Sequence, residues 1–410
     1  MTRRKASFIG LVVAVASLSA AVPVAWSQQV VKLGEGETLT ISGFVNASLF
    51  NDRGSFAGGF SNGQSAEWAA LAQPPPRQGI FDGDVRNTRI NFTFAGPPVI
   101  GKWSPKATIE ADFFGAFNGA PPNGDEQPQL RLRFAFVDLT NGSTTLRIGQ
   151  YWSPMFGETG VSLTHIAFPL GYGAAGDVGW RFPGVFLYHD LTPGKPWNFQ
   201  IQVAAMKGSG PIAAGNPFDA AGNVGIGEAS GIPQIETRLN VAHKFSNVSW
   251  TGYAVYHIDW KNGTGTGTNG ALVPGFGYET GHRVEFSGFT LHGNFYYGKA
   301  IGQQFGHISQ QQLNVRGWGA WAQAGYDFTP HWSLWEFYGM DQPDYARYNQ
   351  ETGLVLPRQL NHDNDVLLRF RAGRYALGLE YFRAVTRWGT LTTGTITNAD
   401  QYALSVLYNF

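Results

Sequence analysis

Hydrophobic and polar residues alternate with a period of two in many separate runs along this chain. The run at the C-terminus is the clearest, because Tyr402, Leu404, Val406, Tyr408 and Phe410 fall on one face and mostly polar or small residues on the other. A period of two indicates a β-strand. Aromatic residues at both ends of an aliphatic stripe are typical of a strand that crosses a membrane.

The same pattern predicts sixteen strands over the whole chain. Their ranges are 38–50, 85–95, 106–117, 130–137, 144–152, 180–190, 197–207, 233–244, 248–260, 279–286, 289–300, 315–328, 331–340, 365–371, 375–388 and 401–410. Long and short links alternate between them, as in barrels with long external loops and short periplasmic turns. The expected fold is therefore an all-β, antiparallel transmembrane β-barrel. Fourteen or eighteen strands stay open as alternatives, because 180–190 and 331–340 alternate poorly.

The N-terminus has the pattern of a cleaved secretory signal. Basic residues at 3–5 precede an apolar run over 8–24, and small residues flank Trp26 before Gln28. We therefore expect a signal peptide over 1–27 and a single barrel domain over 28–410. The alternative is an uncleaved anchor, but the apolar run is short for that role and is interrupted by polar residues and a proline.

Composition excludes several classes of function. Removal of 1–27 would leave 26 basic and 29 acidic residues, a net charge of about −3, which is not the balance of a nucleic-acid-binding protein. The chain has no cysteine, so disulfides and thiolate metal sites are excluded. The nine histidines show no pair at metal-ligand spacing with a supporting carboxylate. No metal and no cofactor are predicted.

Three stretches resemble motifs of the DcaP-like porin family. They are IEADFFG at 109–115, LRLRFAFVD at 130–138 and LRIGQYWSPMF at 146–156, within a matching region of 85–156. The resemblance implies a homotrimer of sixteen-stranded barrels in the outer membrane of a Gram-negative cell, passing small solutes that are often anions or dicarboxylates. Family members often carry a periplasmic coiled coil, but the leader at 28–37 is too short for two heptads, so no function of that extension is expected.

The last strand also resembles the closing strand of bacterial outer-membrane barrels. Their final residue is commonly Phe and is read by the barrel-assembly machinery, so Phe410 and Tyr408 are the expected assembly signal. We expect 401–410 to pair with 38–50 and close the sheet, since no open sheet edge is stable in lipid. Outer-membrane lipid and lipopolysaccharide are the other expected partners.

If the apolar face of each strand contacts lipid, the opposite face lines the lumen. The basic residues predicted there are Arg89, Arg131, Arg133, Arg147, Arg238, Arg283, Arg369 and Arg371. The acidic residues predicted there are Glu110, Asp112, Glu236, Glu285, Glu336 and Glu380. Arginine therefore outnumbers acid on the expected inner wall, which favours anions.

The link at 153–179 is a candidate constriction loop, because it holds more apolar residues than a solvated loop does. Its acids Glu158 and Asp177 are expected to face the adjacent Arg131, Arg133 and Arg147 across the narrowest point. The alternative is that each arginine pairs with an acid on a neighbouring strand, such as Glu110 or Asp112, since opposite charges on adjacent strands commonly pair.

A passive diffusion channel is the function that these features favour. Glu110 and Asp112 share a strand face and could form an acid/base pair, but no other catalytic feature accompanies them, so no enzymatic activity is expected. An outer-membrane barrel enzyme and a secreted soluble β-protein that binds carbohydrate through its aromatic residues are the alternatives.

Overall fold

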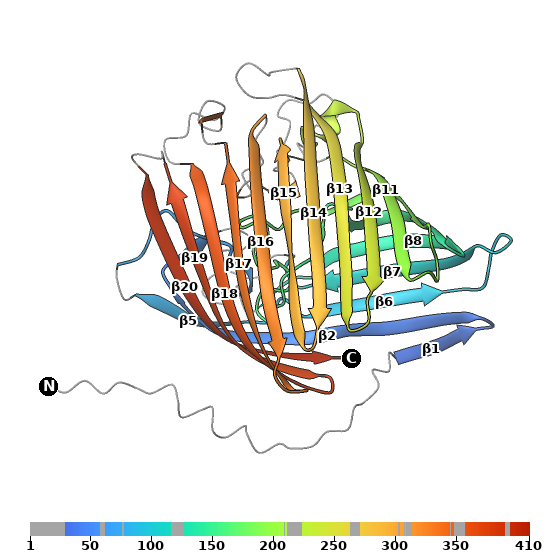
Figure 1. The fold of residues 1–410 in the computed structure, drawn as a ribbon, viewed down its shortest axis with the longest axis horizontal. Coiled ribbons are helices and arrows are strands. Elements are labelled where there is room, and N and C mark those ends of the chain that lie inside the picture. Colours follow the sequence, from blue (N-terminus) through green and yellow to red (C-terminus); the bar gives the residue numbers. More distant parts are fainter. Residues whose placement is uncertain are drawn as a thin grey trace.

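The protein is a closed antiparallel barrel of sixteen strands (Figure 1), as the alternating pattern predicts. The computed structural model describes residues 29–57, 62–75, 78–115, 127–208, 210, 224–262, 271–301, 304–306, 308, 314–344, 346–347, 357–389 and 394–410. In Figure 1 the strands β2, β6, β7 and β8 run across the view, at an angle to the upright strands β13 to β16. This crossing reflects the tilt that closing a sheet requires.

The strands follow one another in chain order around the barrel. Their bounds are β1 (Gln29–Gly34), β2 (Glu37–Arg53), β3 (Phe56–Ala57), β4 (Trp68–Ala69), β5 (Gly79–Asp84), β6 (Arg89–Ala95), β7 (Ser104–Asp112), β8 (Arg131–Asn141), β9 (Thr144–Trp152), β10 (Arg181–Asp190), β11 (Trp197–Met206), β12 (Gln234–Lys244), β13 (Val248–Asn262), β14 (Leu272–Phe286), β15 (Phe289–Lys299), β16 (Arg316–Asp327), β17 (Trp332–Pro343), β18 (Arg358–Ala372), β19 (Tyr375–Trp388) and β20 (Thr395–Asn409). Two short 3-10 helices lie at Gly63–Ser65 and Glu228–Ser230.

The strands β3 and β4 form a separate two-stranded sheet. The other eighteen segments make sixteen wall strands, because β1 is accessory and because β5 and β6 count as one. The strand β2 pairs with β6 along its first half and with β5 along its second half, so β5 and β6 together act as one wall strand. The sequence predicted a single strand over 85–95 and a loop before it. The leader also contains a strand that the sequence did not predict, since β1 pairs with the first residues of β2.

The barrel closes where the sequence predicted. Residues 400–409 of β20 pair with 44–53 of β2, and the Phe410 amide donates to the Gly43 carbonyl at 3.0 Å while the Gly43 amide donates to Phe410 O at 3.2 Å. Gly43 has φ of +152°, and a Cβ placed on it would lie 2.1 Å from the Arg89 carbonyl oxygen. Both the dihedral and the close approach therefore require glycine at this seam.

We expect the Gly43→Val substitution to prevent closure of the barrel in most molecules. The strained dihedral alone costs about 2 kcal/mol, and the backbone contact with Arg89 adds to it. The fraction folded after dilution from urea into detergent is read from heat-modifiable mobility on a gel. Gly96→Ala is the matched control, because its new Cβ has ordinary room, with Pro105 Cγ at 3.5 Å. Equal folded fractions for the two variants would contradict this role of Gly43.

A belt of exposed apolar side chains covers the outside of the wall. Val45, Leu49, Ile109, Val137 and Ile148 are each about half exposed, whereas the residues between them on the same strands face inward. A soluble sheet would bury such a belt rather than expose it. Within the described residues, no helix has the length and apolar character needed to span a membrane.

Candidate functional site

The segment between β9 and β10, residues 153–179, lies inside the barrel. Its hydrogen bonds reach Glu236 from Met155 N (2.7 Å), Gln323 from Val161 N (2.6 Å), Glu380 from Thr164 N (3.0 Å), Asn46 at Leu163 O (3.0 Å) and Asn361 at Ala174 O (3.1 Å). These partners belong to β12, β16, β19, β2 and β18. Only the interior of a closed barrel is within reach of strands so widely spread around its wall.

Glu380 is the strongest single anchor of this segment. Its carboxylate accepts hydrogen bonds from the Ser162 hydroxyl, from Leu163 N at 3.2 Å and from Thr164 N at 3.0 Å, and the residue is 5% exposed. A carboxylate that accepts backbone N–H groups makes charge-assisted bonds that are stronger than neutral ones. This acid on the inner wall therefore fixes the loop in place.

A second segment, residues 62–69, also folds inward, although the sequence indicated only a loop there. The Gln64 amide donates to Asn46 Oδ1 at 2.7 Å and to Ser48 Oγ at 2.8 Å, and Ala69 N donates to Thr386 Oγ1 at 2.9 Å. An apolar cluster joins the two inward segments to the wall, with members Phe56, Ala66, Ala69, Leu170, Trp321, Phe337, Phe382, Ala384 and Ala399. The side of the lumen next to β16–β20 is therefore filled.

The arginines of β8 do not face Glu158 or Asp177, so that expectation is wrong. Arg131 pairs with Asp112 at 2.6 Å, and Arg133 pairs with Asp112 and with Glu110, both at 2.8 Å. Arg89 of β6 approaches the same Glu110 at 3.7 Å. These contacts match the alternative expectation, in which each arginine pairs with an acid on a neighbouring strand. The physical reason is proximity, since adjacent inward-facing positions are closer than the far side of a lumen.

A bulge in the β7–β8 pairing changes which residues of β8 face inward. The register shifts between Glu110 and Ala111, after which Phe136 is buried and Val137 is half exposed. The sequence pattern predicted the reverse, with Phe136 facing lipid and Val137 facing the lumen.

Arg147 of β9 lies over the Phe136 ring, with Cζ 3.8 Å from its centroid, and pairs with Asp138 of β8 at 2.7 Å.

Arg238 and Arg283 contact the first part of the inward segment, at residues 154–158. Arg238 Nη1 donates to the backbone oxygens of Pro154 at 2.9 Å and Phe156 at 3.2 Å, while Arg283 lies 3.5 Å from Glu158. Glu158 also lies 3.3 Å from His292 Nδ1. Burial acts to raise the pKa of Glu158, but the hydrogen bond and charge of His292, with the charge of Arg283, hold the pKa below its usual value.

Three hollows adjoin one another along the barrel wall beside residues 153–161. The first hollow has a volume of about 560 Å³ and extends from Lys106 to Arg238. The second has a volume of about 260 Å³ and lies between Arg238 and Glu158. The third has a volume of about 550 Å³ and is lined by Arg283 and by the short turns at 246–247 and 287–288. Arg238 lines both the first and the second hollow, and Arg283 joins the third to Glu158.

Basic side chains outnumber acidic ones in these hollows. Seven bases line them, namely Lys106, Arg147, Arg238, Lys244, Arg283, Arg369 and Arg371, against four acids, namely Asp138, Glu158, Glu285 and Asp327. Arg369 donates to the Ser333 hydroxyl at 3.2 Å and Arg371 pairs with Asp327 at 3.1 Å. Glu285 pairs with Arg283 at 2.7 Å. The hollows thus carry a net positive charge along one side of the lumen.

Two of the remaining predicted acids, Glu236 and Asp177, are buried in different surroundings. Glu236 is buried, 2.9 Å from His257 Nδ1, and accepts a bond from the inward segment. Asp177 is fully buried and forms no ion pair with the described residues. Burial, with the nearby charge of Glu279, raises the pKa of Asp177 well above its usual range. Asp177 is therefore a buried interior group and makes none of the expected contacts with Arg131, Arg133 or Arg147.

Glu336 of β17 does not face the lumen, which corrects the prediction. It is exposed on the same side as Leu334 and Tyr338, while Trp335 and Phe337 are buried. The inner face of β17 is apolar because the inward segments pack against it, with Phe337 in the shared cluster. The rule that polar residues face inward fails wherever protein, and not water, fills the lumen.

The sequence reasoning missed Arg181 at the start of β10. Its guanidinium lies near the rings of Trp152 and Trp180, with Cζ 4.8 and 4.3 Å from their centroids. Its Nε and Nη1 have no hydrogen-bond partner within the part of the chain that the structure describes. The adjacent tryptophan at position 180 was a signal for this arrangement, since arginine commonly stacks on aromatic faces. Asp138 and Lys106, also unpredicted, pair at 3.1 Å.

The described residues include no group of three or more His, Asp or Glu side chains placed to hold a metal ion. Several carboxylates on the inner wall instead meet arginine, histidine or backbone donors, namely Glu110, Asp112, Asp138, Glu236 and Glu380. The site is thus a set of polar surfaces that can contact a passing solute.

Comparisons with known proteins support the fold. No protein-family model matches the chain, and no curated protein matches it. The outer membrane channel DcaP of Acinetobacter baumannii is 14% identical, with 93% of this chain and 99% of that chain covered and a TM-score of 0.66. The anion-selective porin from Comamonas acidovorans is 12% identical, with 91% and 100% covered and a TM-score of 0.55.

The trimer form of in-vitro folded OmpT, an outer membrane protein of Vibrio cholerae, is 10% identical, with 92% of this chain and 100% of that chain covered and a TM-score of 0.52. At such identities the similarity shows the fold. This chain has the barrel fold of outer-membrane proteins, in agreement with the resemblance seen in its sequence.

Proposed function

We propose that the protein is a porin in the outer membrane of a Gram-negative bacterium. It forms a water-filled channel through which small hydrophilic solutes diffuse passively, with anions and carboxylates preferred. The observation that carries this proposal is the series of three adjoining hollows beside residues 153–161, where seven basic and four acidic side chains meet. Rings and rows of basic side chains favour anions in a pore.

Several further features support the location and the assembly. The exposed apolar belt suits contact with outer-membrane lipid, including lipopolysaccharide. Residues 1–27 would direct export, and Phe410 with Tyr408 would be read by the barrel-assembly machinery. The solved trimer form of OmpT supports a homotrimer. Residues 153–179 would act as the constriction loop, because they occupy the lumen.

The protein is not proposed to be an enzyme. Glu110 and Asp112, the candidate acid/base pair, are both engaged by Arg133 at 2.8 Å, so neither is poised to take a proton from a substrate. Binding of carbohydrate by a secreted soluble form is disfavoured by the apolar belt.

Planar bilayers test the channel and its selectivity. The purified protein should give stepwise currents and, in a salt gradient, a reversal potential of the sign for anion preference. The double variant Arg369→Gln/Arg371→Gln removes two of the seven bases and should move the anion-to-cation permeability ratio about twofold or more toward cations.

Lys102→Gln is the matched control, because Lys102 lies in the short link between β6 and β7 and lines none of the three hollows. Wild-type protein that inserts but passes no stepwise current would overturn the proposed channel. A double variant with unchanged selectivity would overturn the role of the hollows.

A further inference from the structure

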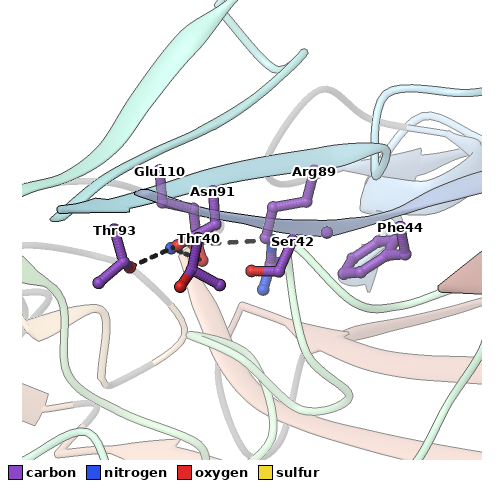
Figure 2. A pocket seen from close by; sticks show the side chains of 8 residues that line it. Thr40, Ser42, Phe44, Arg89, Asn91, Thr93 and Glu110 are labelled. Carbon is purple, nitrogen blue, oxygen red and sulfur yellow. Dashed lines mark hydrogen bonds and ion pairs between the residues drawn. The ribbon is translucent and has the colours of Figure 1, made fainter. Parts of the chain in front are cut away.

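A fourth hollow lies on the inner wall away from the three described above (Figure 2). Its volume is about 390 Å³, and its lining includes Thr40, Ser42, Phe44, Arg89, Asn91 and Glu110 from β2, β6 and β7. The inward side chains of β6 alternate with Phe92 and Phe94, which are exposed on the outer face. The hollow therefore opens toward the lumen.

Arg89 is incompletely paired within this hollow. Its Nε and Nη2 atoms are buried and have no hydrogen-bond partner among the described residues, and its Nε lies 3.7 Å from Glu110 Oε1. That oxygen already accepts a bond from Arg133 Nε at 2.8 Å. Buried charged donors are normally hydrogen-bonded, and an unpaired one is costly. The side chain is 18% exposed, so its flexible end can turn toward an anion that enters.

The surrounding charges leave room for one negative charge. Among the described residues, Glu110 is the acid within ion-pair distance of Arg89, and Arg133 already binds the same carboxylate oxygen at 2.8 Å. The positive charge of Arg89 is therefore incompletely compensated. One carboxylate can neutralise it, whereas a second negative charge on the ligand would add repulsion from Glu110 without a further cation to offset it.

The other lining groups suit a ligand with hydroxyl groups. The hydroxyls of Thr40 and Ser42 lie two residues apart on one face of β2 and bond to no described side chain, so both can contact a ligand. In contrast, Thr93 donates to Asn91 Oδ1 at 3.0 Å. The Phe44 ring, with Arg89 Cζ 5.1 Å from its centroid, offers an apolar face for a short carbon chain.

We propose that this hollow is a binding site for small hydroxylated monocarboxylates, the class that gluconate represents. The carboxylate binds the Arg89 guanidinium, and ligand hydroxyls bond to Thr40, Ser42 and Glu110. The site gives the lumen a place where such solutes pause, in addition to the general anion preference. It rests on the proposed channel only in that the ligand arrives through the lumen.

Isothermal titration of gluconate into the folded full-length protein in detergent tests the site. Saturable binding is expected for gluconate, with none for glucose, which has the hydroxyls but no charge. The Arg89→Gln variant should weaken gluconate binding about tenfold or more, as expected for loss of a charge-assisted contact. Gluconate binding that is absent in wild type, or equal to that of glucose, would overturn the proposal.

Two further variants separate the site from general effects. Lys102→Gln removes a base that lines none of the four hollows and should leave gluconate binding unchanged. Thr40→Ala/Ser42→Ala should weaken gluconate binding about threefold but leave propionate, which has no hydroxyl, unaffected. The double variant also serves if Arg89→Gln does not fold. Equal affinity of wild type and both site variants, or equal losses with Lys102→Gln, would contradict the assignment.

The titration needs no membrane, so its result is independent of the channel test. Wild-type protein that conducts without binding gluconate overturns only the site. Protein that binds gluconate without conducting overturns only the channel.

Discussion

Arg133→Ala is expected to destabilise the barrel by about 3 to 5 kcal/mol, the usual cost of removing one partner from a buried ion pair. Arg133 is 2% exposed and bonds to both Glu110 and Asp112, and Asp112 is fully buried. Without Arg133, Glu110 would keep only the longer contacts with Arg89 and Asn91, and Asp112 would keep Arg131 as its only cationic partner. Urea unfolding in lipid vesicles, followed by tryptophan fluorescence, measures the change.

Arg371→Ala is the matched control for this prediction. Arg371 also pairs with an acid on the inner wall, Asp327 at 3.1 Å, but both side chains are more than 40% exposed. Pairs that are open to solvent contribute at most about 1 kcal/mol. If both substitutions lower the free energy of unfolding equally, the β7–β8 network is not a buried structural unit.

Removing the inward segment is expected to raise single-channel conductance about threefold or more, because the narrowest cross-section limits current through a pore. The structure supplies a clean way to do so. Trp152 and Arg181 are paired, and Ser153 N donates to Trp180 O at 2.8 Å. Replacing residues 154–179 by an Asn-Gly turn therefore continues an existing hairpin.

The excision leaves inner-wall groups without their partners, chiefly Glu380, Asn361 and Asn87. Water that enters the widened lumen can bond to them, so the barrel should still fold. Val161→Ala keeps the segment and its backbone bonds to Gln323, and should leave conductance unchanged. An excised barrel that folds with wild-type conductance would show that this segment does not limit the pore.

The wall was predictable from the sequence because a lipid-facing stripe imposes a period of two on each strand. The strand at 144–152, for example, has the same bounds in the structure, and the seam between the first and last strands pairs as expected. The ends of strands were less predictable: β14 begins at Leu272, before the predicted start at Glu279. The stretch 272–278 alternates in burial, but its inward positions hold Val273, Gly275 and Gly277 rather than polar side chains, so its sequence shows no apolar–polar contrast.

The site was less predictable than the wall for two physical reasons. A bulge moves all later residues of a strand to the opposite face, as at Phe136 and Val137, and the sequence of β8 alone does not show it. The inward position of 62–69 and 153–179 depends on partners distant in sequence. Their presence makes the inner face of β17 apolar and places Glu336 outside.

The inward segments also constrain the order of folding. Thr164 Oγ1 lies 2.8 Å from Ser405 Oγ, which in turn lies 2.7 Å from Ser48 Oγ, so three hydroxyls from the inner segment, the last strand and the first strand meet at one point. The inner segment cannot complete this contact until β20 has joined β2. The contact among these three hydroxyls therefore forms only after the two ends of the chain have met.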